Sequence, residues 1–117
     1  MEIVKTGIRL STNRWIETVH FYQDILGFSV FQAGERWIIF DLGAGYLLLE
    51  QGGNALERNQ EQWRTALRFD VKNLDALIHQ FEEQLIVFKK SADFDWEDLV
   101  TLVDPGGNQI EFKQIFT

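Results

Sequence analysis

The hydrophobic positions of the first half alternate with polar ones in short runs and recur at helical spacing in one longer stretch. The segment Ile3–Leu10 is β-rich, and Ser11-Thr12-Asn13 after it is typical of a helix start. Apolar residues then recur every three to four positions up to Gly27, which stands where a helix-terminating glycine is expected. Three short strands follow, at Phe28–Gln32, Arg36–Asp41 and Tyr46–Glu50, so this half predicts a β-α-β-β-β unit.

The second half predicts the same order of elements. A strand at Thr65–Val71 precedes a helix at Leu74–Gln84. Between the halves, the polar segment Gln51–Gln62 is interpreted as a linker, and Ser91–Asp98 as an acidic loop that carries Phe94 and Trp96. The remaining strands are expected at Leu85–Lys89, Leu99–Val103 and Gln109–Ile115.

Individual residues repeat along with the elements, which indicates an internal duplication. An offset of 59 pairs Thr6 with Thr65, Ile8 with Leu67, Arg9 with Arg68, Val19 with Ile78, His20 with His79, Tyr22 with Phe81 and Leu26 with Leu85. An offset of 63 pairs Asp41-Leu42-Gly43 with Asp104-Pro105-Gly106, Leu47 with Ile110 and Leu49 with Phe112. The offset is four residues larger towards the C-terminus, which fits a longer loop near Phe94–Asp98 in the second half. We therefore predict one domain made of modules 1–50 and 63–117 joined by linker 51–62.

Composition narrows the function classes. The 117 residues are 45% hydrophobic and have a formal net charge of −7, which argues against a nucleic-acid partner because phosphate binding needs a basic face. The absence of cysteine excludes disulfides, a thiolate nucleophile and a cysteine-based zinc site. Apolar runs are too short to span a membrane, and Met1–Lys5 lacks the pattern of a signal peptide. We expect a soluble, cytoplasmic protein with no membrane partner.

Two stretches, Phe21–Phe28 at the end of the first helix and Asp104–Phe112 in the last hairpin, carry a family resemblance. Within a duplicated β-α-β-β-β chain, they resemble the vicinal oxygen chelate superfamily of glyoxalase, bleomycin-resistance and dioxygenase-like proteins. The resemblance implies an α+β fold in which two βαβββ modules in tandem form a curved mixed sheet around a cleft. It also implies a homodimer. Phe21, Tyr22, Leu49 and Phe112 are interpreted as core or turn anchors.

The resemblance also implies a metal centre, with ligands on the first and last strands of each module. Those positions here carry Lys5, Leu48, Ala66 (Arg64 if the register slips by two) and Glu111. Only Glu111 offers a ligand-type side chain, and one carboxylate cannot supply the three donors that a catalytic centre needs. We predict that the metal site is lost and that no cofactor is bound. His20 and His79 lie within helices and are expected at the surface.

Strand alternation predicts what lines the cleft instead. The inner surface would carry Arg9, Arg64, Arg68 and Glu111, with Trp37, Trp63 and Trp96 near its rim. These side chains suit a small, partly aromatic ligand with an anionic group. The alternative, which we favour for this pair, is that Arg68 and Glu111 form an internal ion pair.

Three function classes follow from the sequence. The first is a metal-free module that binds a small organic ligand, as in antibiotic resistance or sequestration. The second is a metal-dependent lyase or dioxygenase whose ligands are misaligned above, supported by the resemblance and Glu111. The third is a protein-interaction member without a small ligand, supported by Phe94-Asp95-Trp96. Catalysis is undecided at this point, and the missing ligands favour the first class.

Overall fold

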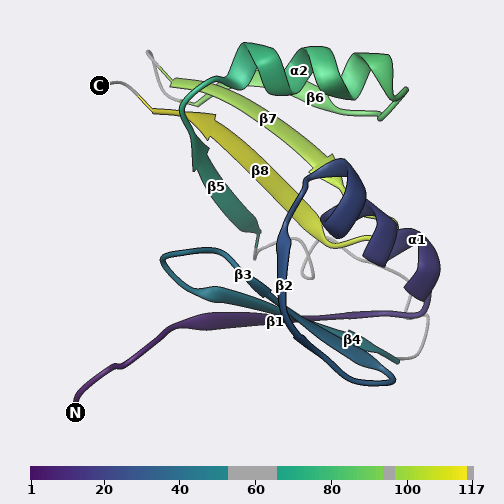
Figure 1. Ribbon diagram of the computed structural model, residues 1–117. Coiled ribbons are helices and arrows are strands. Elements are labelled where there is room, and N and C mark those ends of the chain that lie inside the picture. Colours follow the sequence, from purple (N-terminus) through teal and green to yellow (C-terminus); the bar gives the residue numbers. More distant parts are fainter. Residues whose placement is uncertain (53–65, 94–96, 116–117) are drawn as a thin grey trace. The chain divides into compact units, whose positions relative to one another are not determined.

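The computed structural model describes residues 1–52, 66–93 and 97–115. The chain divides into two compact units. Unit 1 is Met1–Glu57 with Pro105–Gly107, and unit 2 is Arg58–Asp104 with Asn108–Thr117. Each unit contains one four-stranded mixed sheet and one helical segment (Figure 1). No helix in the described part of the chain is long and apolar enough to cross a membrane.

In unit 1 the strand order is β1-β4-β3-β2. β1 pairs with β4 in parallel, whereas β2–β3 and β3–β4 are antiparallel hairpins. The helical segment connects β1 to β2 and consists of an α-helix followed by a π-helical turn, η1. The bounds are β1 (Gly7–Thr12), α1 (Trp15–His20), η1 (Phe21–Ile25), β2 (Ser29–Ala33), β3 (Trp37–Asp41) and β4 (Tyr46–Gln51).

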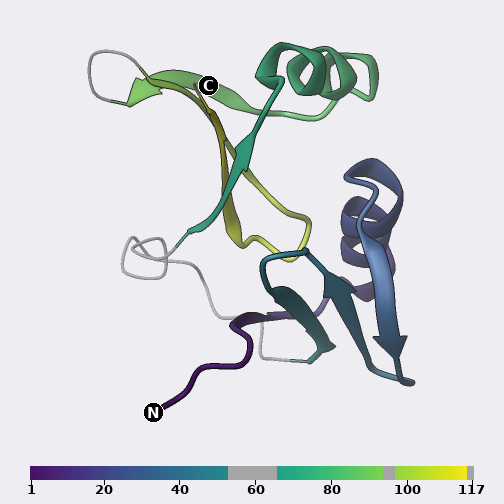
Figure 2. The same cartoon turned by 60° about the vertical axis from the view of Figure 1, so that its left-hand side comes forward.

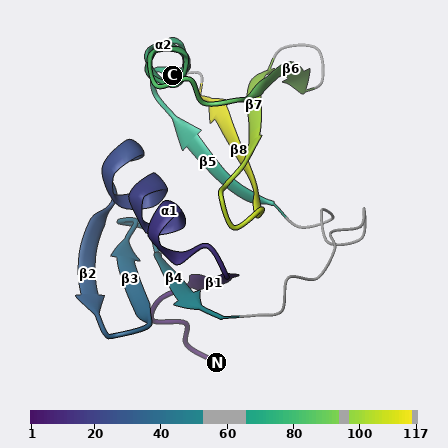
Figure 3. The same ribbon diagram turned by 90° about the vertical axis from the view of Figure 1, so that its right-hand side faces the viewer.

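Unit 2 repeats this topology, with strand order β5-β8-β7-β6. β5 pairs with β8 in parallel, and the other neighbours are antiparallel. Figures 2 and 3 show α2 alongside this sheet. The bounds are β5 (Leu67–Val71), α2 (Leu74–Glu83), β6 (Lys89–Asp93), β7 (Glu97–Val103) and β8 (Gln109–Gln114).

Each sheet buries one face under its own helix. In unit 1 the Tyr22 ring lies 6.2 Å from the Phe40 ring, and both residues are fully buried. In unit 2, α2 buries Leu74, Ile78 and Phe81, whose spacing places them on one face of the helix. The core prediction is confirmed for Phe21, Tyr22, Leu49 and Phe112, which are all at most 3% exposed.

The strand registers confirm the internal repeat. Ile8 pairs with Leu47 on β4, and its predicted counterpart Leu67 pairs with Ile110 on β8. The next pairs, Arg9 with Leu48 and Arg68 with Glu111, keep the same correspondence. Both sequence offsets, 59 for the first strands and 63 for the last, therefore hold in the structure.

The first strand begins later than predicted, at Gly7 instead of Ile3. Its partner strand starts at Tyr46, whose N–H donates to the Thr6 carbonyl, so residues before Thr6 have no strand beside them. Ile3 and Val4 are accordingly 67% and 93% exposed. The strand also continues to Thr12, past the predicted end at Leu10.

The first helix starts without the side-chain cap that Ser11-Thr12-Asn13 predicts. Arg14 occupies the N-cap position, and its N–H donates to the Thr12 hydroxyl at 2.9 Å. The buried Thr12 hydroxyl also bonds to the Thr18 hydroxyl at 2.9 Å, which ties the strand end to the helix. The predicted terminator Gly27 is confirmed, with a φ of 73°.

The predicted strand Leu85–Lys89 is wrong, because the chain needs Leu85–Phe88 to leave the helix. Leu85 has a φ of 57°, and its N–H donates to the Glu82 carbonyl while the Ile86 N–H donates to the Phe81 carbonyl. This is the Schellman ending of a helix. The strand, β6, begins only at Lys89.

Three further expectations are corrected. Leu26 and Leu85 are not equivalent, because the left-handed residues are Gly27 and Leu85 and the π turn adds one residue to the first helix. The predicted loop Ser91–Asp98 belongs mostly to the ladder, in which Asp93 pairs with Glu97. The expected linker 51–62 begins too early, because Gln51 is the last residue of β4. Residues 53–62 lie outside the described residues, and so do Phe94 and Trp96.

Candidate functional site

Each sheet has a second face that carries the polar side chains, which we call its open face. On β4 the buried Leu47 and Leu49 point to the helix side, so Tyr46, Leu48 and Glu50 alternate onto the open face. On β8 the buried Ile110 and Phe112 leave Gln109, Glu111 and Lys113 on the open face. Four of the predicted site residues belong to the described part of the chain, and all four lie on these two faces: Arg9, Trp37, Arg68 and Glu111.

In unit 1 the open face holds an ion pair that joins β1 to β4. Arg9 lies opposite Leu48 in the ladder, and its Nε reaches diagonally to the Glu50 carboxylate at 3.6 Å. The side chains are 69% and 38% exposed, so water screens the pair strongly. Arg9, which the sequence predicts to line a ligand-binding cleft, therefore has an acidic neighbour that was not predicted.

Two aromatic side chains lie flat on the same face. A Cβ atom on Gly7 would overlap with the Tyr46 ring, and one on Gly34 would overlap with the Trp37 indole. The rings thus cover strand and turn backbone that has no side chain of its own. Trp37, predicted at the rim of a cleft, is partly exposed on β3 and packs on the turn that follows β2.

In unit 2 the corresponding ion pair joins directly opposed residues. Arg68 faces Glu111 in the parallel ladder, and its Nε lies 3.4 Å from the Glu111 carboxylate. The side chains are 38% and 21% exposed, which makes this the more buried of the two pairs. The predicted ion pair between Arg68 and Glu111 is confirmed.

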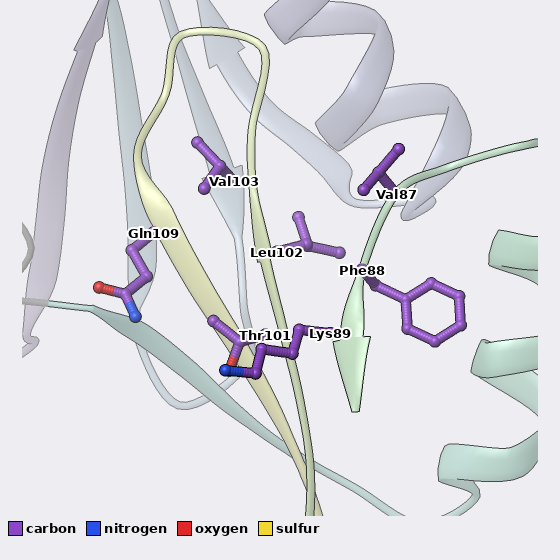
Figure 4. A pocket seen from close by; sticks show the side chains of 7 residues that line it. All are labelled: Val87, Phe88, Lys89, Thr101, Leu102, Val103 and Gln109. Atoms are coloured by element: carbon purple, nitrogen blue, oxygen red, sulfur yellow. The ribbon is translucent and has the colours of Figure 1, made fainter. Parts of the chain in front are cut away.

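Unit 2 also contains a hollow of about 350 Å³, lined by residues from the start of β6, the end of β7 and the start of β8 (Figure 4). Val87, Leu102 and Val103 contribute apolar side chains to its lining, and the Phe88 ring lies 6.0 Å from the Phe81 ring of α2. The Gln109 Oε1 atom is buried and accepts no hydrogen bond. The full lining is Val87, Phe88, Lys89, Thr101, Leu102, Val103 and Gln109.

The hollow adjoins the ion pair through the strand register. Glu111 pairs with Thr101 on β7, and Thr101 pairs with Lys89 on β6. Arg68, Glu111, Thr101 and Lys89 therefore form one row across the four strands of unit 2, with a cation at each end. Val103 and Gln109, which also pair, belong to the next row.

The residues at these positions do not fit a divalent metal. Leu48 and Ala66 carry no donor atom, and the carboxylates of Glu50 and Glu111 are each beside an arginine. Lys5 precedes β1, and its ammonium lies 5.6 Å from the centroid of the Phe31 ring. Within residues 1–52, 66–93 and 97–115, no three histidine or acidic side chains gather into a possible metal site.

The remaining predicted residues lie away from these faces or outside the described chain. His20 and His79 are exposed as predicted, and the His20 Nδ1 atom lies 2.8 Å from the Asp24 carboxylate. Arg64, Trp63 and Trp96 are outside the described residues. Sequence reasoning did not select Lys89, Thr101, Val103 and Gln109, which line the hollow. Alternation was a usable signal for Thr101, Val103 and Gln109, because their strands lie close to the predicted bounds, whereas Lys89 needed the correct start of β6.

A fold of two βαβββ modules with mixed sheets defines a class of small proteins, and the comparisons with known proteins identify the family. The model of the Glyoxalase/Bleomycin resistance protein/Dioxygenase superfamily matches residues 8–112. The chain belongs to this superfamily, as its resemblance predicted. No curated protein matches the sequence.

Solved structures with this fold include proteins of different functions. A glyoxalase/bleomycin resistance protein/dioxygenase from Alicyclobacillus acidocaldarius has a TM-score of 0.78 at 19% identity, covering 97% of this chain and 92% of its own. A lactoylglutathione lyase from Agrobacterium tumefaciens has a TM-score of 0.76 at 18% identity, with coverages of 97% and 95%. TnmS3, an antibiotic binding protein from Streptomyces sp. CB03234, has a TM-score of 0.77 at 18% identity, covering 99% of both chains. At these identities the likeness concerns the fold alone.

Proposed function

We propose that the protein binds a small organic ligand without the help of a divalent metal. The observation that carries this proposal is the engagement of both open-face carboxylates, Glu50 and Glu111, by arginine side chains. A carboxylate held by a guanidinium is a poor ligand for a cation, because the metal must displace one charge from the other. The surrounding strand positions offer no histidine that could replace it.

The ligand we propose is small and partly aromatic, and it carries an anionic group. The hollow in unit 2, which Lys89 lines, and Arg68 at the other end of the same row of paired residues support this chemistry. The antibiotic-binding function named for TnmS3 supports the capacity of this fold to hold an organic molecule. Arg9 and Trp37 on the open face of unit 1, with Arg64 and Trp96, complete the proposed set of ligand-binding residues.

A metal-dependent lyase is the second candidate, because Glu111 retains a ligand-type side chain and a lactoylglutathione lyase shares the fold. Metal content separates the two proposals. We expect no stoichiometric metal in protein dialysed against Ni²⁺, Zn²⁺, Mn²⁺ or Fe²⁺ salts and then against buffer, as measured by elemental analysis.

The same measurement on Glu111→Gln and Glu50→Gln supplies matched controls, since each removes one open-face carboxylate. About one ion per chain that is lost only in Glu111→Gln would overturn the proposal and establish the lyase or dioxygenase class. Equal background in all three proteins supports metal-free binding.

We further propose a homodimer in the cytoplasm that associates with neither membranes nor nucleic acid. The acidic composition, with 18 acidic and 11 basic residues, supports the exclusion of nucleic acid. Ten phenylalanines and four tryptophans in a chain of this length support the burial of apolar surface between two copies.

A further inference from the structure

The connection between α2 and β6, residues 85–88, presents aliphatic side chains to water. Leu85 is 88% exposed and Val87 is 89% exposed. We propose that this connection is the surface through which two copies of the chain associate about a two-fold axis. The inference rests on the homodimer of the proposed function and identifies the residues that form its contact.

The backbone of Leu85 supports a role for its side chain. Its φ of 57° lies in the left-handed region, where a side chain with a Cβ atom is strained. The residue at the equivalent helix end in unit 1 is Gly27, which adopts its φ of 73° without that penalty. Packing within the chain does not offset the strain, because the Leu85 side chain is exposed. Strained residues cluster at functional sites, and burial of this leucine against a second copy gives it a function.

Opposite charges flank the connection on its two sides. Glu82 and Glu83 are exposed in the last turn of α2. Lys89 and Lys90 are exposed at the start of β6. Neither Glu83 nor Lys90 forms an ion pair with another described residue. An apolar segment with an acidic end and a basic end is complementary to a second copy of itself related by a two-fold axis, which is why we assign a second copy as the partner.

A two-fold axis at Val87 determines which groups meet. Residues equally far from Val87 along the chain then face one another, so Leu85 lies beside the aliphatic stem of the partner's Lys89. The end of α2 at Glu83 lies towards the partner's Lys90. The aliphatic side chains form the centre of the contact and the charges form its rim, as in protein interfaces generally. Because Val87 also lines the hollow (Figure 4), the contact covers one side of the rim and leaves the interior to the ligand.

Leu85→Gly tests the apolar part of the contact. In sedimentation equilibrium of the full chain, we expect the dissociation constant of the dimer to rise about a hundredfold, because the dimer loses two buried leucine side chains. Phe31→Ser is the matched control, since Phe31 is 67% exposed but lies on β2, and it should leave the constant unchanged. Urea unfolding at concentrations where the parent chain is monomeric should show that Leu85→Gly is no less stable as a single chain.

A charge exchange tests the two-fold arrangement. Glu83→Lys alone and Lys90→Glu alone should each weaken the dimer about tenfold, because each homodimer then contains two like-charge contacts. When the two variants are mixed, they should associate with each other in preference to themselves, because both contacts become attractive again. Native mass spectrometry, with one variant labelled with ¹⁵N, measures the heterodimer fraction. The control mixture is Glu35→Lys with Arg36→Glu, two exposed residues of unit 1, and it should show random exchange.

The outcomes distinguish this surface from the proposed homodimer. A parent chain that stays monomeric at millimolar concentration would refute the homodimer, and the surface with it. A dimer that tolerates Leu85→Gly, or random exchange between the two charge variants, would refute the surface alone. Dissociation by Phe31→Ser instead would place the contact at β2 and overturn the inference. If Leu85→Gly does not fold, the charge exchange still decides the assignment.

Discussion

Gly27 and Leu85 occupy the same place at the ends of the two helices, with φ values of 73° and 57°. Glycine adopts this conformation without penalty, whereas a side chain with a Cβ atom costs about 1–2 kcal/mol there. The Leu85 side chain is 88% exposed and recovers little of that cost through packing. The second helix therefore ends in local strain that the first helix avoids.

We expect Leu85→Gly to stabilise the protein by about 1 kcal/mol, because it removes the steric penalty and little buried surface. Urea denaturation of the variant and the parent protein measures the difference in the free energy of unfolding. Leu85→Ala is the control, since alanine shortens the side chain but keeps the Cβ atom. Equal stabilisation by both variants would show that exposed apolar surface, not backbone strain, is the cause.

At the scale of elements, the two open faces show the same arginine with a displaced acid. Arg9 and Arg68 hold equivalent positions on β1 and β5, but their partners Glu50 and Glu111 are not equivalent on β4 and β8. Arg68 faces its partner directly, whereas Arg9 reaches diagonally to a residue two positions further along. Each module thus pairs one arginine with one carboxylate on its open face, but the geometry of the pair differs between the two modules.

Double-mutant cycles should resolve the two geometries. We expect a coupling of about 0.5–1 kcal/mol between Arg68 and Glu111, and about 0.2–0.5 kcal/mol between Arg9 and Glu50, because the second pair is more exposed. Replacement by glutamine, singly and together, removes the charge from each partner while keeping a polar side chain, and thermal denaturation at low salt provides the energies. A larger coupling for Arg9 and Glu50 would contradict this account.

Elements bounded by clear turn residues could be predicted from the sequence, and those bounded by backbone geometry could not. Gly43-Ala44-Gly45 separates β3 from β4, and the turn after Asp104 separates β7 from β8, so these strands lie close to their predicted bounds. A leucine in a left-handed conformation gives no signal in the sequence, so β6 was predicted too early. That error concealed Lys89 as a neighbour of Thr101, and with it the hollow.

At the scale of the whole molecule, we predict that two copies of the chain associate. β2 lies at the edge of its sheet with all five residues exposed, and Phe31 on it is 67% exposed. Such an edge needs protection from uncontrolled pairing. We expect size-exclusion chromatography with light scattering to give about twice the 13.7 kDa chain mass at micromolar concentration. A monomer that persists at millimolar concentration would refute the dimer.

The parallel pairing of the first and last strand in each module has a kinetic consequence. β2–β3 and β3–β4 are local hairpins, which form within microseconds, whereas β1–β4 and β5–β8 join residues about 40 positions apart. The strand that opens each module is therefore expected to join its sheet last during folding. Until it does, one edge of β4 or β8 is unpaired, and there a newly synthesised chain is most prone to exchange strands with another copy.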